Sequence, residues 1–316
     1  FTALGYRVSG ESGVRAVAFL SSFGILSLIY LITHQVTRKP LVSLFAAVAP
    51  LSMGTFIHVL LVIRAYLPAV FLLLVMVLGI LRGSKRGVFA AGVFYSLTYH
   101  ALQMPLFVLF VWWAVQHLRG ERDHLALHGI AGLAAGTVIN PYFPSNVAMT
   151  LVHVQVALSQ FQPTGLDFGP EQAPYRSDGF LFVFRYVFLF LGLNLAVLWL
   201  KSPASRQVRK TTEEFERNYL FLGLLSWSLF LLMFLSPRFQ EYLIPIVSIY
   251  LGMGLSVLAN EGLVMTALSG ALVIATVLMP PLRNFDGLVA SFRQFDDSYF
   301  GIIRDLPPAY VFNCDW

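Results

Sequence analysis

Long apolar runs without charge recur along this sequence, and they constrain its fold more than any other feature. A helix of about 20 apolar residues spans the roughly 30 Å hydrocarbon core of a bilayer. Only 12% of the 316 residues are charged, whereas soluble domains carry about 25%. The pattern therefore predicts an all-α, polytopic transmembrane helical bundle, because backbone polar groups in lipid must be satisfied within the structure.

About eight runs are read as full spans, and they cover residues 14–34, 41–62, 66–81, 124–139, 179–200, 219–235, 242–259 and 263–282. The stretch from Gly87 to Leu118 differs, because breaks near Tyr99-His100 and Pro105 divide it into two pieces too short to cross comfortably. Breaks are tolerated in a membrane only where protein or water covers the backbone. We therefore expect a short broken helical hairpin that enters and leaves on the same side.

Lysine and arginine divide the connecting segments into two sets, and short loops rich in these residues stay in the cytoplasm. One set, with the loops near Arg38, Arg82 and Arg119 and the segment 201–217, holds twelve of the 21 basic residues but only six of the 16 acidic ones. This set is expected to be cytoplasmic. The segments 1–13, 140–178, 236–241 and 283–316 are then expected on the outer side.

The domain organisation follows from these spans. We expect a transmembrane helical domain at 1–283, with a long outer loop at 140–178, and the start of an extracytoplasmic segment at 284–316. The chain opens at Phe1 without a secretory signal and is read as part of a longer protein. Basic residues are scattered through short loops rather than gathered in a stripe, which argues against nucleic acid as a partner.

Arg238 and Glu241 form the most unusual charged pair, because they lie three residues apart between two long apolar runs. Charges at such a place need a partner, a polar ligand or a wet cavity. Two interpretations stay open. The pair satisfies itself, since helical i,i+3 spacing brings the side chains together, or it also meets a ligand at the outer face.

Four further residues are candidate contacts for a substrate. Asn140 and Tyr142 lie in the segment Asn140-Pro141-Tyr142-Phe143-Pro144, where the prolines end a helix and the aromatic pair also suits a membrane-interface belt. His100 lies in the hairpin break, where it faces a cavity or hydrogen-bonds freed carbonyls. Arg64 lies at an outer helix boundary, where its guanidinium either binds an anion or extends to the membrane interface.

Phosphate-binding glycine loops, zinc-ligand spacings and serine nucleophile motifs are absent from the sequence, and no metal site is predicted. The order of the remaining motifs resembles bacterial proteins of the type C (GT-C) glycosyltransferase superfamily. The residues that carry this resemblance are Arg64 to Pro68, Thr98-Tyr99-His100, Asn140 to Pro144, Arg238 with Glu241-Tyr242, and Val311 to Trp316.

The resemblance implies an enzyme of the bacterial inner membrane and cell envelope. Such an enzyme transfers a hexosyl or pentosyl group from a polyprenyl-phosphate carrier to an acceptor on the outer side, so its partners are a lipid-linked sugar donor and membrane lipids. Arg64 and Arg238 would meet the lipid phosphate, and Glu241 would position Arg238. The family's catalytic carboxylate lies in the first outer loop, which here is expected upstream of Phe1, since Glu11 is the only acid in residues 1–13.

Two other classes of protein remain open at this point. A transporter or lipid flippase would use the same spans and the same broken hairpin, with paired charges along a path through the bilayer. A noncatalytic membrane scaffold would need only helix packing. Convergence of Arg64, His100, Asn140, Arg238 and Glu241 around one outward-facing site would favour the enzyme.

Overall fold

The computed structural model describes residues 2–53, 56–57, 60, 66–121, 123–159, 187, 191, 194, 213–234 and 237–259, and these residues form helices and no strand. The all-α prediction is therefore confirmed for this part of the chain. The helices, in chain order, are α1 (Thr2–Thr37), α2 (Pro40–Val48), η1 (Ala49–Ser52), α4 (Tyr66–Leu81), α5 (Lys85–Thr98), α6 (Gln103–Leu118), α7 (Leu125–Ile139), α8 (Ser145–Ser159), α10 (Glu213–Met233), η3 (Pro237–Phe239) and α11 (Gln240–Leu258).

The prediction of about eight full spans is wrong for the described helices. Two of them, Arg15–Thr37 and Gln240–Leu258, are long and apolar enough to cross a bilayer. The apolar helices α4, α6 and α7 have 15 or 16 residues, which at 1.5 Å per residue gives only about 23 Å. The expected spans 179–200 and 263–282 lie outside the described residues, apart from three helical positions in the first.

Two predicted boundaries are also corrected. The expected span 41–62 is interrupted, because α2 ends at Val48, η1 follows with Pro50, and Met53 is extended. Pro50 has no N–H to continue the α-helical hydrogen bonds. In the hairpin, Pro105 causes no break because it lies in the first turn of α6, where the amide would lack an intrahelical partner anyway. The break lies instead at Tyr99–Leu102.

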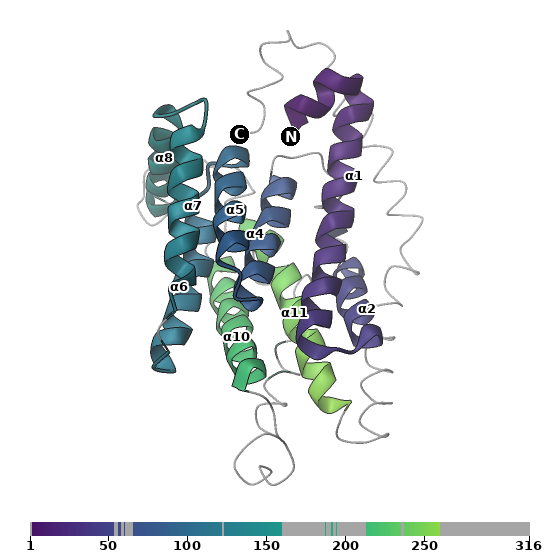
Figure 1. The fold of residues 1–316 in the computed structure, drawn as a ribbon. Coiled ribbons are helices and arrows are strands. Elements are labelled where there is room, and N and C mark those ends of the chain that lie inside the picture. The colour runs from purple at the N-terminus through teal and green to yellow at the C-terminus, as the bar shows by residue number, and fades with distance from the viewer. Residues whose placement is uncertain are drawn as a thin grey trace.

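Short polar turns fix the antiparallel order of α4 to α7 (Figure 1). The Ser84 hydroxyl caps α5 by accepting from the Gly87 amide at 3.1 Å. The Asp123 carboxylate accepts from the Leu125 amide at 3.0 Å where α7 begins. Gly83, in the turn before α5, has φ of 64°, which favours glycine because a side chain would be strained there.

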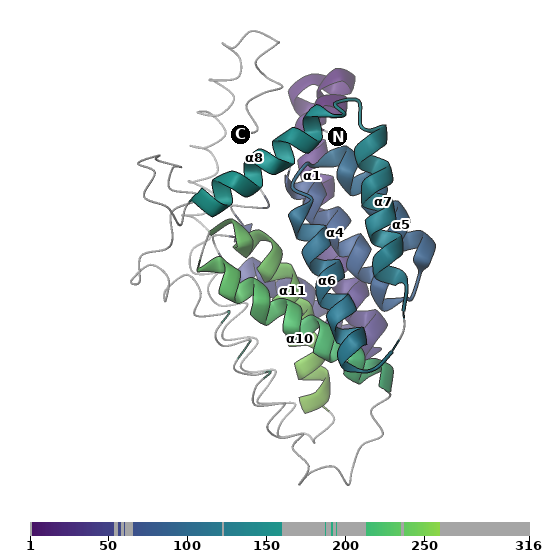
Figure 2. The same cartoon turned by 90° about the vertical axis from the view of Figure 1, so that its left-hand side faces the viewer.

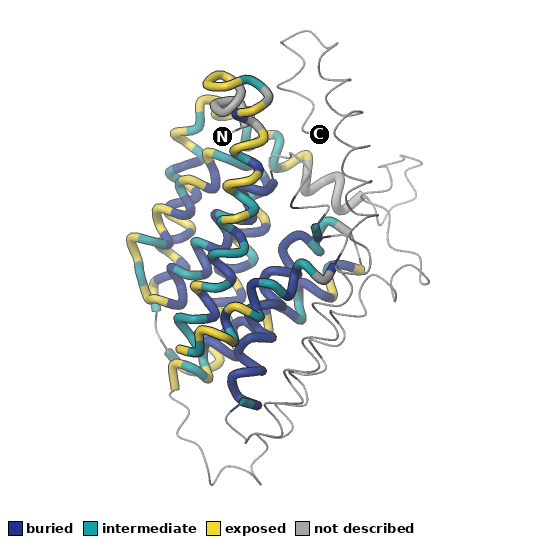
Figure 3. The backbone as a smooth tube through the Cα atoms, turned by 90° about the vertical axis from the view of Figure 1, so that its right-hand side faces the viewer, coloured by how far each residue is buried: buried dark blue, intermediate teal, exposed yellow. Residues whose placement is uncertain are grey.

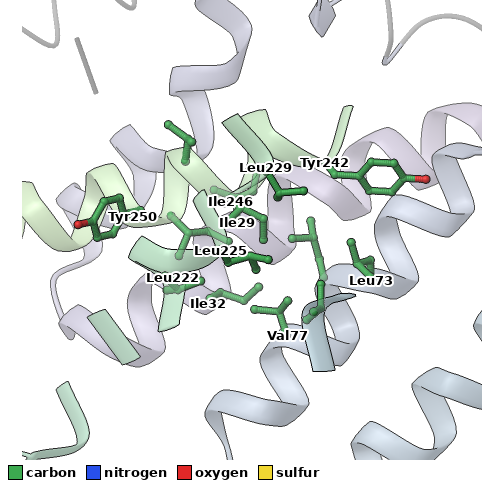
Figure 4. Close-up of a cluster of buried hydrophobic side chains, with 14 of the residues drawn as sticks. Ile29, Ile32, Leu73, Val77, Leu222, Leu225, Leu229, Tyr242, Ile246 and Tyr250 are labelled. Atoms are coloured by element: carbon green, nitrogen blue, oxygen red, sulfur yellow. The ribbon is translucent and has the colours of Figure 1, made fainter. Parts of the chain in front are cut away.

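The core lies around α11, whose residues from Glu241 to Leu258 are all buried. Helices α1, α2 and α10 pack against it. Figure 4 shows its apolar side chains Ile246 and Tyr250 among those of α1, α4 and α10. Burial of this apolar surface and dispersion contacts between close-packed side chains hold the bundle together.

Exposed residues follow the outward side of the bundle (Figure 3), and many of them are apolar. Large side chains stand exposed along α1, α6 and α7, among them Phe19 at 70%, Phe23 at 62%, Phe110 at 58% and Leu127 at 60%. Soluble monomers rarely expose contiguous apolar patches of this extent. Together with the two candidate spans, this surface is evidence for a membrane protein.

Candidate functional site

The polar interactions described below lie at the two ends of the helical bundle. At one end, the Lys39 ammonium donates to the Ser256 carbonyl at 3.0 Å, which ties the α1–α2 turn to the last turn of α11. At the same end of the antiparallel bundle, Glu121 pairs with Arg119 and Arg217. The opposite end contains the α5–α6 break, the α7–α8 turn and the corner between η3 and α11. Most of the predicted site residues lie there.

The α5–α6 break is closed by side chains that donate to its carbonyls. The Asn140 amide nitrogen donates to the Ser96 carbonyl at 2.9 Å. The Thr150 hydroxyl donates to the His100 carbonyl at 2.8 Å. The Tyr95 hydroxyl donates to the Ala101 carbonyl at 3.2 Å. Because freed carbonyls in a membrane need donors from within the protein, these hydrogen bonds stabilise the break.

Tyr242 connects the break to the first turn of α11. Its side chain lies close enough to that of Tyr95 for each hydroxyl to affect the pKa of the other. The single proton of the Tyr95 hydroxyl goes to the Ala101 carbonyl. In Figure 4 the Tyr242 hydroxyl points away from the apolar cluster. The two tyrosines therefore bring the start of α11 next to α5 and the break.

Arg238 and Glu241 occupy the corner that precedes this tyrosine. Arg238 lies in η3 and is half-buried, whereas Glu241 in the first turn of α11 is buried, with 9% of its surface exposed. A carboxylate in the first helical turn is stabilised by the unpaired amides and the dipole of the helix. Glu241 also acts electrostatically on the neighbouring Tyr242 hydroxyl. The two charged residues thus differ in solvent exposure, although both lie at the corner between η3 and α11.

His100 and Glu241 both adjoin a network of neighbouring residues, because His100 precedes Ala101, whose carbonyl accepts from Tyr95, and Glu241 precedes Tyr242. The half-buried His100 ring lies against Tyr99, with ring centroids 5.0 Å apart. Asn140 lies at the C-cap of α7, and its side chain hydrogen-bonds to backbone groups. Its amide nitrogen donates to the Ser96 carbonyl, and its oxygen accepts from the Tyr142 amide at 3.0 Å.

Two predicted residues stand apart from this network. The Tyr142 side chain is 75% exposed at the tip of the α7–α8 turn, as expected for an interface belt. Arg64 lies outside the described residues, so its predicted proximity to Arg238 stays a prediction.

Sequence reasoning missed Tyr95 and Thr150, and it quoted Tyr242 only as part of a motif. One signal was present, because Tyr95 and Tyr99 are four residues apart and therefore share a helix face; their rings meet edge to face at 6.3 Å. The pairing of Tyr95 with Tyr242 depends on the packing of distant segments and has no local signature.

The opposite end carries the ion pairs with a clear electrostatic effect. The Arg119 Nε donates to Glu121 at 2.7 Å, and an Arg217 terminal nitrogen lies 3.4 Å from the other carboxylate oxygen. The hydrogen bond from Arg119 lowers the pKa of Glu121, and Arg217 adds to this effect. Arg217 also lies over the Trp112 ring, 5.5 Å from its centroid. Within the described ranges, no three His, Cys, Asp or Glu side chains are grouped to hold a metal ion.

No protein-family model matches this chain, and no curated protein matches it.

Proposed function

We propose that this chain forms the membrane-embedded part of a polytopic bacterial inner-membrane glycosyltransferase. The enzyme would transfer a sugar from a polyprenyl-phosphate carrier to an acceptor on the outer side of the membrane. The corner of Arg238 and Glu241, next to the α5–α6 break, would hold the phosphate of the carrier. His100 at the break and Asn140 beside it are polar residues at the same end of the bundle.

The observation that supports this assignment most is the difference in burial between Arg238 and Glu241. Arg238 is half-buried and so partly exposed, whereas Glu241 is buried at the start of α11. A guanidinium presents planar paired donors that suit phosphate oxygens. A buried carboxylate beside it favours a fixed orientation of the arginine. Glu241 is therefore proposed to position Arg238, and the reaction's general base is assigned to no described residue.

The chemistry required of this corner is limited. The acceptor attacks the anomeric carbon of the sugar, the bond from that carbon to the phosphate oxygen breaks, and polyprenyl phosphate leaves with the electron pair. A carboxylate would take the proton of the acceptor. Arg238 would stabilise the charge that grows on the departing phosphate, which is the kind of contact that lowers a barrier.

The distribution of charge favours an interfacial site over a path through the bilayer. Among the described helices, α4, α6 and α7 contain no Asp, Glu, Lys or Arg, and α10 and α11 carry theirs only within the first five residues. Transporters commonly place such groups along the spans. The exposed apolar surface beside the corner would let a lipid-linked substrate approach from the membrane plane.

Binding of farnesyl phosphate, a short polyprenyl phosphate, tests the assignment. We would titrate the full-length protein in dodecyl maltoside by calorimetry, with farnesol as the control ligand that lacks the phosphate. Arg238→Ala should weaken binding of farnesyl phosphate by about tenfold or more, since hydrogen bonds to charged groups contribute about 1.5–3 kcal/mol. Arg238→Lys should retain part of the affinity, because it keeps the charge and loses the planar fork.

Arg82→Ala is the matched control, since Arg82 is exposed in the turn after α4, at the opposite end of the bundle. This variant should bind as the wild type does. Equal affinity of wild type and Arg238→Ala, with both eluting as folded protein in size exclusion, would remove the phosphate role from Arg238. Loss of folding in Arg238→Ala would instead identify a structural ion pair.

A further inference from the structure

Helix α8 has its polar face towards the protein and its apolar face outward, the reverse of a helix on a soluble domain. The inward face holds the polar residues Asn146 and Thr150, with Met149 beside them, and all three are half-buried. The Asn146 amide donates to the Thr137 carbonyl at 3.0 Å, and the Thr150 hydroxyl donates to the His100 carbonyl.

The outward face holds Val147, Leu151 and Val152, which are 37%, 59% and 46% exposed. At 100° per residue these three side chains, with the exposed Ala148 between them, lie on the side opposite Asn146 and Thr150. Water is a poor solvent for this face, and the exposure of each residue costs free energy in proportion to its apolar area.

The surface next to this face identifies what covers it. Near the end of α7, Val138 and Ile139 are 61% and 66% exposed, and the turn adds Tyr142 and Phe143 at 75% and 49%. The outward apolar surface therefore continues from α7 around the turn to α8. Figure 2 shows that α8 runs across the bundle rather than along α7. Aromatic residues gather where a membrane meets water.

We infer that α8 is an interfacial helix whose outward face, Val147, Leu151 and Val152, lies in the headgroup and acyl boundary of the outer leaflet. A helix in this position buries its apolar face about 5–10 Å into the boundary. The occupant is lipid because the face is continuous with the exposed side of α7. This placement does not depend on glycosyl transfer.

The position of α8 has a structural consequence for the α5–α6 break. Thr150, on the protein side of α8, holds the His100 carbonyl. The helix at the membrane surface is thus attached to the break by a hydrogen bond, and it sets the depth at which His100 lies relative to the lipid headgroups.

Nitroxide labelling tests the location of the outward face. Cys314 is the only cysteine, so Cys314→Ser gives a background into which Leu151→Cys or Val152→Cys can be introduced singly. The full-length protein is reconstituted in liposomes of phosphatidylethanolamine and phosphatidylglycerol. Collision of each label with oxygen, which concentrates in lipid, is compared with collision with a water-soluble nickel chelate. Phe110→Cys on the exposed side of α6 gives the lipid reference, and Arg82→Cys gives the water reference.

Labels at 151 and 152 should favour oxygen over nickel several-fold more than the label at 82, and less than the label at 110. Equal behaviour of 151 and 82 would place the face in water and overturn the inference. Low collision with both reagents would show that a second copy or another part of the chain covers the face, and it would overturn the inference as well. Two independent positions keep the test valid if one variant does not fold.

Discussion

The contact between α5 and α7 makes Gly132→Ala a sensitive test of the packing. A Cβ atom at Gly132 would overlap the Phe89 carbonyl oxygen and would lie 2.9 Å from the Phe89 carbonyl carbon and 3.0 Å from its Cα. All three atoms are backbone, so no side-chain rotation can relieve the clash. The two helix axes would have to move apart. Small residues at such positions are what allows membrane helices to approach closely.

Two opposing effects decide whether Gly132→Ala raises or lowers the stability of the protein. Helix propensity alone favours alanine over glycine by about 1 kcal/mol. Overpacking typically costs about 1–3 kcal/mol, and separation of the helices would also stretch the hydrogen bond from the Ser96 hydroxyl to the Leu133 carbonyl, now 2.9 Å. Cross-helix hydrogen bonds in membranes contribute about 0.6 kcal/mol on average. The net expectation is a loss of about 1–2 kcal/mol.

Thermal unfolding in detergent, followed by fluorescence-detected size exclusion, measures this loss. Gly132→Ala should melt several degrees below the wild type. Ala134→Val is the control on the same helix, because Ala134 is exposed and can accept two further carbons without a clash. A Gly132→Ala variant as stable as the wild type, or more stable, would refute the close approach of α5 and α7.

Two other perturbations test the two ends of the bundle. Tyr95→Phe removes the donor to the Ala101 carbonyl, so it should cost about 0.5–1.5 kcal/mol of stability. Tyr142→Phe, at an exposed position, should show no thermal shift, and equal shifts of the two variants would contradict the role of the Tyr95 hydroxyl. At the other end, the lowered pKa of Glu121 means that its ionised form is favoured by folding, so its stabilising effect is present at neutral pH and is lost as the pH falls below about 4. Glu121→Gln should melt slightly below the wild type at pH 7, and the two proteins should melt together at pH 3. A difference in melting temperature that persists at pH 3 would show that the ionised Glu121 carboxylate is not its cause.

Sequence reasoning located several helices closely because apolar runs are bounded by polar or turn-forming residues. The run 66–81 coincides with α4, and the run 124–139 differs from α7 by one residue. Among the described helices the same reasoning overestimated the number of full spans, because hydropathy reports composition over a window and does not show where a helix ends. Pro50 illustrates this: it lies within an apolar run, yet α2 stops before it.

Prediction of the site was limited for a different reason. Arg238 and Glu241 were visible as charges among apolar residues, and their shared corner follows from local spacing. Their difference in burial depends on how α11 packs in the bundle, which local sequence does not encode. The roles of Asn140 and Thr150 as donors to backbone carbonyls likewise depend on which helix ends are neighbours.

The α5–α6 break explains why polar side chains from separate elements meet at this end of the bundle. An uninterrupted helix would satisfy its own carbonyls, whereas the break depends on Asn140 from the α7 C-cap, Thr150 from α8 and Tyr95 from α5. Tyr242 extends this dependence to α11, one residue after Glu241. A ligand that draws Arg238 outward would therefore act on the first turn of α11, then on Tyr95 and on the carbonyl it holds. We therefore expect a substitution at either Tyr95 or Tyr242 to alter binding of the proposed phosphate ligand at Arg238 without contact with the ligand.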